Sequence, residues 1–218
     1  ANGDYSCNTG FIGVGDEAAC QSAVLCLGQL RKQFGERFRA TFGDHELGKV
    51  SLAGNQGGLR LASWQRAVQD LRLEPFWQVE FGNYVLLGVV STLLALPIFE
   101  PEAVPAEVPE WRSLRERHLG DIRSAFAALK PSQKVILFCH DPTAIPFLWQ
   151  EEGIRSKVGQ IEKTIIGHLH SPLILWKSRF LAGIPPIHFL GNSIRRFSTA
   201  LHEAQHWEAF NVHLCPSL

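Results

Sequence analysis

Two histidines at the end of a predicted strand are the residues of this chain best suited to chemistry. His168 and His170 stand in the sequence GHLHSP, directly after the apolar segment 163–166. Strand side chains alternate between the two faces, so positions i and i+2 point the same way. The two imidazoles can therefore serve one site without backbone strain, and imidazole is the commonest metal ligand among side chains.

Three upstream fragments of matching chemistry precede this pair. They are Asn-Gly-Asp at 2–4, Gly-Asp-His-Glu at 43–46 and Cys-His-Asp-Pro at 139–142. Each is common by itself, since an aspartate after glycine can simply shape a turn and a lone histidine can be structural. Their occurrence together favours a metal site. Two divalent cations about 4 Å apart can activate water and clamp a phosphate, and imidazole with carboxylate suits Zn, Mn or Fe.

In the elements that must position these residues, predicted strands and helices alternate in a βαβ order. Helices are predicted over Asp16–Phe34, which Gly35 ends, over 62–71 and 110–129, and in part of 147–160. Prolines predict an irregular excursion over 97–109. Predicted strands are 37–42, one or two within 77–90, 134–139, 163–166, 173–176, 188–190 and 210–214. The candidate ligands thus fall repeatedly at the C-terminal ends of strands, where open α/β sheets place their sites.

In order and spacing, the four fragments resemble the motifs of the calcineurin-like metallophosphoesterases. The resemblance implies a single α/β domain over 1–218, a two-sheet β-sandwich flanked by helices in four αββα layers, with N-terminal strands missing. It implies two divalent metal ions (Mn, Fe or Zn), a bridging hydroxide that attacks phosphorus, and His45 as the acid that protonates the leaving oxygen. The implied metal ligands are Asp4, which bridges the ions, and Asp44, His140, His168 and His170.

The resemblance has two departures. The family's first motif, Asp-x-His, is missing because only three residues precede Asp4, and the absence of any methionine leads us to expect an incomplete N-terminus. Asp44 stands where the family has asparagine. Its negative charge should tighten cation binding and weaken the binding of a phosphate anion. Without the first motif, a non-catalytic interaction scaffold is the alternative to an enzyme.

Two further patterns leave other interpretations open. His202, Glu203 and His206 form an H-E-x-x-H sequence, which on a helix would hold zinc in a peptidase. Only twelve residues follow His206, and none of them supplies the further zinc ligand that such a peptidase needs. Arg195 and Arg196 could bind a substrate phosphate or be a solvated surface pair. The expected substrate is a phosphorylated small molecule or macromolecule.

The bulk composition limits the partners and the compartment. With 218 residues, 45% hydrophobic content and a net charge of zero, the chain gives no electrostatic reason to expect nucleic acid or an anionic membrane. The uncharged segment 81–99 is interrupted by glycine, asparagine and proline, which predicts a buried strand and loop and no transmembrane segment. Five cysteines without a C-x-x-C pair indicate a reducing, cytoplasmic setting.

Overall fold

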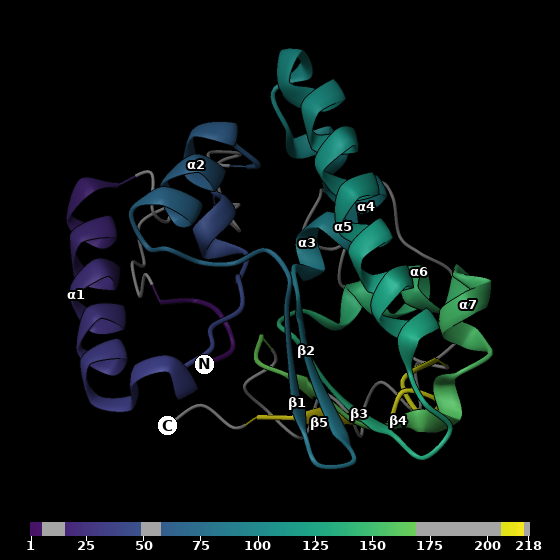
Figure 1. Ribbon diagram of the computed structural model, residues 1–218. Helices are drawn as coiled ribbons and strands as arrows, with labels where there is room; N and C mark the ends of the chain where they lie inside the picture. Colours follow the sequence, from purple (N-terminus) through teal and green to yellow (C-terminus); the bar gives the residue numbers. More distant parts are fainter. Residues whose placement is uncertain (6–15, 49–57, 169–205, 216–218) are drawn as a thin grey trace.

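The computed structural model describes residues 1–5, 16–48, 58–168 and 206–215, which form an α/β fold around one mixed sheet (Figure 1). The five strands lie in the order β1-β2-β3-β4-β5. Their bounds are β1 Trp77–Phe81, β2 Tyr84–Val89, β3 Lys134–Cys139, β4 Ile161–Ile166 and β5 Val212–Leu214. Only β1 runs antiparallel to its neighbour; the other pairs are parallel. The predicted α/β class is confirmed.

Helices cover one face of this sheet. In β3 the fully buried Val135 and Leu137 alternate with half-buried residues, and they pack against Ile122 and Phe126 of α5. Figure 1 shows α5, α6 and α7 on this side of the sheet. Their bounds are α5 Val108–Ala128, α6 Ile145–Gln150 and α7 Glu152–Arg155. Buried residues of β3 and β4 belong to this core, and the candidate histidines follow those two strands.

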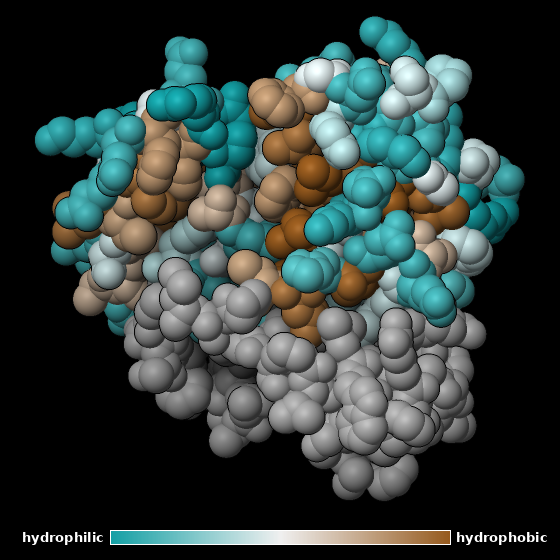
Figure 2. Space-filling model, turned by 90° about the horizontal axis from the view of Figure 1, so that it is seen from below, coloured by the Kyte–Doolittle hydropathy of each residue, from teal (hydrophilic) through white to brown (hydrophobic). Residues whose placement is uncertain are grey.

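The opposite face of the sheet is also apolar. Leu86 of β2 and Phe138 of β3 are half-buried there, and with Val79, Phe34 and Phe38 they line a groove of about 490 Å³. Seen from below, the described residues carry a patch of apolar side chains bordered by polar ones (Figure 2). A sheet that is apolar on both faces is typical of folds in which both faces are covered.

A second apolar core lies beside the sheet. It joins α1 (Glu17–Phe34) and α2 (Leu61–Gln69) to the short helices α3 (Ser91–Leu94) and α4 (Leu96–Phe99). The ring of Phe42 stacks on Trp64 at 5.1 Å, and Trp64 meets Trp111 edge-on at 6.1 Å. This packing fixes the segment that leads into residues 43–46. The helix α1 begins as predicted, because the Asp16 side chain accepts the Ala19 N–H at 2.9 Å.

Two predictions about secondary structure were wrong. The strand expected over 37–42 is a short 3₁₀ turn, η2 (Gly35–Arg37), followed by extended chain in which only Thr41 forms a bridge, to Asn2. Among the described residues this bridge is the one β-pairing of the segment, and a single bridge does not make a strand. The excursion expected over 97–109 is largely helical, because each proline sits in the first turn of a helix, where its missing N–H costs nothing.

The remaining short elements complete the described chain. They are η3 (His45–Leu47), η4 (Glu100–Glu102), η5 (Pro105–Glu107), η6 (Pro142–Ala144) and η7 (Val158–Gln160). The strand predicted over 210–214 is present as β5, while the predicted strands 173–176 and 188–190 lie outside the described residues. Within the described ranges, no helix has the length and apolarity needed to span a membrane.

Candidate metal centre

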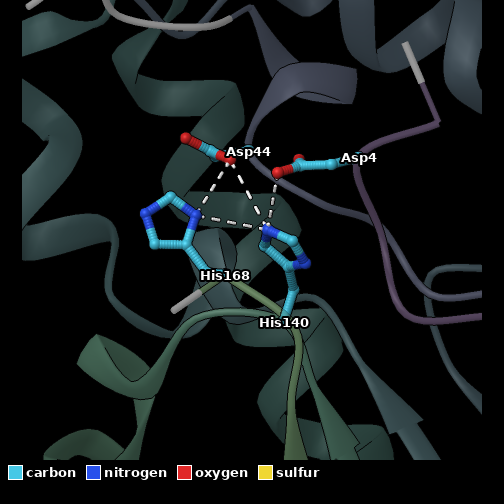
Figure 3. Close-up of side chains that lie close together, drawn as sticks. All are labelled: Asp4, Asp44, His140 and His168. Atoms are coloured by element: carbon cyan, nitrogen blue, oxygen red, sulfur yellow. Dashed lines mark hydrogen bonds and ion pairs between the residues drawn. The ribbon is translucent and has the colours of Figure 1, made fainter. Parts of the chain in front are cut away.

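Four side chains that are distant in sequence converge at the C-terminal edge of the sheet (Figure 3). His140 follows β3 and His168 follows β4; because these strands are parallel neighbours, their ends meet. Asp44 directly precedes η3, and Asp4 belongs to the N-terminal segment. One ligand atom from each of the four lies within 4.8 Å of all the others. The structure thus brings together residues from all four sequence fragments.

The spacing of the ligand atoms suits one transition-metal ion. The Nε2 atom of His140 lies 3.1 Å from Asp4 Oδ2 and 3.6 Å from Asp44 Oδ1. The Nδ1 atom of His168 lies 3.5 Å from the same Asp44 oxygen and 3.3 Å from His140 Nε2. Tetrahedral ligands about 2.1 Å from an ion lie about 3.4 Å from one another. The four distances above lie close to this value and the remaining two are within 4.8 Å, and two imidazoles with two carboxylates suit Zn, Mn or Fe in chemistry.

The ring of His140 is fixed by its second nitrogen. Nδ1 lies 2.7 Å from the Asn2 carbonyl oxygen, to which it donates, so Nε2 is left to face the carboxylates. The His140 carbonyl in turn accepts the N–H groups of Gly167 and His168, at 3.0 and 2.9 Å. These bonds join the turn after β4 to the end of β3. Backbone groups thus set the orientation of the His140 ring and the position of the His168 main chain, while the His168 ring contacts the side chains of His140 and Asp44.

Glycines before the two aspartates let their turns approach closely. A β-carbon at Gly43 would lie 2.2 Å from Asp4 Oδ1 and 2.4 Å from the Asp4 backbone nitrogen. At Gly3, where φ is +81°, a β-carbon would lie 2.4 Å from Nδ1 of His140. A side chain at Gly43 would displace the Asp4 carboxylate, and one at Gly3 would displace the His140 ring.

Gly43→Ala is accordingly expected to lower the free energy of unfolding by about 1–3 kcal/mol, the usual cost of overpacking. The matched control is Gly28→Ala in α1, where a β-carbon would meet nothing within 4 Å. That control should raise the stability by roughly 0.5–1 kcal/mol, because alanine is the better helix former. Urea unfolding of the metal-free proteins measures both changes, and a Gly43→Ala protein as stable as wild type would contradict the close approach.

The site is electrostatically balanced by protons when it holds no cation. Burial would raise the pKa of the Asp44 carboxyl, but its bonds with His140 and His168 outweigh burial and hold that pKa well below its usual range. Burial would lower the pKa of His140, but Asp4 and Asp44 raise it well above its usual value. Against the same effect of burial, Asp141 and Asp44 raise the pKa of His168 to about 9. Protonated imidazoles thus supply the positive charge that a metal ion would otherwise bring.

His45 lies beside the four ligands without belonging to them. It begins η3, its Nε2 is 3.8 Å from Asp4 Oδ2, and its backbone N–H donates to Asp4 Oδ1 at 3.3 Å. The residue is largely buried, with 9% of its surface exposed, and its ring borders the four ligands through Asp4. An imidazole in this position can transfer a proton next to a bound cation.

The other predicted site residues lie near the C-terminus of the sequence. His170, Arg195, Arg196, His202 and Glu203 all lie outside the described residues. His206, the last residue of the peptidase-like pattern, is described: its ring stacks on Trp149 at 5.2 Å, in the turn that leads to β5. This contact packs His206 against an aromatic ring of the first core.

Three residues around the site were not identified from the sequence. Asn2 orients His140 through its carbonyl oxygen, and Asp141 raises the pKa of His168 while capping η6 through Thr143. Glu46 accepts hydrogen bonds from the backbone around Asp4 and Gly43. All three stand within sequence fragments already singled out, and that proximity was the one available signal.

Comparisons of this chain with family models, with curated proteins and with solved structures gave no match. What the site can do therefore follows from its own residues and geometry.

Proposed function

We propose that this chain is a metal-dependent phosphoesterase of the calcineurin-like kind, which hydrolyses a phosphomonoester or phosphodiester. The observation that carries the proposal is the convergence of Asp4, Asp44, His140 and His168, whose ligand atoms lie within 4.8 Å of one another. These residues come from the four fragments on which the resemblance rests. A chance resemblance would give no reason for the fragments to meet at one point.

Two divalent ions (Mn, Fe or Zn) are part of the proposal. Asp4, Asp44, His140 and His168 would hold one ion, and Asp4 with His170 would contribute to the other. Bound there, the ions would neutralise charge on the phosphoryl oxygens and supply an activated water. The proposal also includes the two-sheet, four-layer sandwich. The apolar second face of the described sheet supports it, because that face is suited to packing against another sheet.

The protein's own side chains would divide the remaining tasks. His45 would protonate the departing oxygen, and Asp4 would orient His45 through the contacts to its ring and its backbone N–H. Arg195 and Arg196 would contact the phosphate group of the substrate, since guanidinium geometry matches phosphate. The substrate would be a phosphorylated small molecule or macromolecule.

Metal content and turnover test this proposal together. We expect elemental analysis to find about two metal ions per chain, and the protein to hydrolyse an aryl phosphate or its diester in added Mn²⁺. His168→Ala should lose both properties, because it removes one of the four candidate ligands, whose Nδ1 lies 3.5 Å from Asp44 Oδ1. His213→Ala, at an exposed position of β5, is the matched control and should keep both.

Other outcomes would assign the chain differently. At most one ion per chain and no turnover would favour a non-catalytic scaffold with this fold. Zinc that survives His168→Ala but disappears on replacement of His202 would favour the peptidase interpretation. Neither outcome is compatible with the proposed phosphoesterase.

A further inference from the structure

Glu46 is a completely buried carboxylate next to the metal centre, yet it is not one of the four ligands. Its Oε2 atom accepts the backbone N–H of Asp4 at 2.9 Å and that of Gly43 at 2.8 Å. Its Oε1 atom accepts the N–H of Tyr5 at 2.9 Å. One side chain thus satisfies three backbone donors from two segments about forty residues apart in sequence.

The segment held in this way needs an external support. Asp4 has φ of +54°, a left-handed conformation that few residues other than glycine adopt. The described segment 1–5 forms no strand of the sheet, and its only β-pairing is the single bridge from Asn2 to Thr41. Consecutive N–H groups at Asp4 and Tyr5 point to one carboxylate, which is the arrangement that stabilises such a turn.

The same carboxylate also determines where Asp44 stands. Its bond to the Gly43 N–H places the Asp44 turn directly against the Asp4 turn, at the contact where Gly43 has no room for a β-carbon. Asp4 and Asp44 are the two carboxylates that face His140. The distance between the two anionic ligands therefore depends on Glu46.

We infer that Glu46 is a positioning residue that holds Asp4 and Asp44 at metal-binding distance. The inference rests on the proposed metal site and adds a residue to it. Two like-charged carboxylates in a metal-free site repel each other, and the backbone bonds to Glu46 keep their turns together. Groups that support metal ligands in this way typically change metal affinity by 10- to 100-fold when they are altered.

The test is the Mn²⁺ affinity of folded Glu46→Gln, measured by calorimetry. Glutamine has the same shape, but one oxygen becomes an NH₂ group that cannot accept a hydrogen bond. We expect affinity to fall by about 10- to 100-fold. The control is Glu80→Gln at an exposed position of β1, which makes the same change in charge and should bind Mn²⁺ as wild type does. A purely structural role would lower the unfolding temperature and leave the affinity of the folded protein unchanged, which would overturn the inference.

A second measurement separates this inference from the proposed function. Amide hydrogen exchange in the metal-free protein should be faster at Asp4, Tyr5 and Gly43 in Glu46→Gln. If wild type binds no Mn²⁺, the proposed function fails, and unchanged exchange at these amides would then overturn the positioning role as well. If Glu46→Gln does not fold, Glu46→Asp keeps the charge but draws the oxygens back by one methylene. For Glu46→Asp we expect the same fall in Mn²⁺ affinity and the same faster amide exchange. An affinity and exchange equal to those of wild type would overturn the inference.

Discussion

His45→Ala is expected to lower the turnover of a phosphate ester by a factor of about 10² to 10⁴ while the metal content stays at the wild-type level. The reason is the position of the ring. It lies 3.8 Å from an oxygen of Asp4, at the edge of the ligand cluster, and it contributes no atom to the four-ligand set. Its removal should therefore take away the proton for the leaving oxygen and leave the ions in place.

The size of the loss in His45→Ala should depend on the leaving group of the substrate. A nitrophenolate leaves readily without a proton, whereas an alkoxide needs one, so the loss in His45→Ala should be largest for alkyl phosphates. Steady-state hydrolysis of both substrate types, together with elemental analysis of the same preparations, measures the difference. Loss of metal from His45→Ala, or an equal loss of turnover for both leaving groups, would contradict the role of His45 as an acid.

Metal affinity is expected to rise steeply with pH up to about 9. In the metal-free site the pKa of His168 is raised to about 9 and that of His140 well above its usual value, so both rings carry protons near pH 7. A metal ion binds only the neutral imidazole, so protons compete with it. Each proton displaced should increase the affinity about tenfold per pH unit, which gives a factor of ten to a hundred per unit between pH 7 and 9.

Calorimetry in buffers of different ionisation enthalpy measures this release of protons directly. Asp44→Asn is the matched variant, because it removes a carboxylate that raises the pKa of both imidazoles. The metal affinity of Asp44→Asn should therefore vary less with pH than that of wild type. The metal-free protein should show the converse trend: paired imidazolium groups stabilise the fold below about pH 6.5, and this contribution is lost as pH rises towards 9. Metal affinity that stays constant from pH 7 to 9 would contradict the charge balance.

Local pattern was enough to predict much of the scaffold. The amphipathic spacing in 110–129 and the β-branched run 134–139 became α5 and β3, since periodicity and chain stiffness are properties of neighbouring residues. Likewise Gly35 marked the end of α1 through its own backbone preference. The prolines of 97–109 misled, because a proline breaks a helix interior but favours a helix start, and which of the two applies depends on where the surrounding chain packs.

The sequence by itself determined which residues could form the metal centre and that His140 and His168 would stand at the ends of strands. Only the tertiary structure decided that Asp4 and Asp44 join them. That convergence depends on a single bridge between Asn2 and Thr41, on glycine contacts too close for a β-carbon, and on the buried carboxylate of Glu46. The physical reason is range: periodicity and propensity act over a few residues, whereas the meeting of two turns forty residues apart is set by packing and hydrogen bonds that no local pattern encodes.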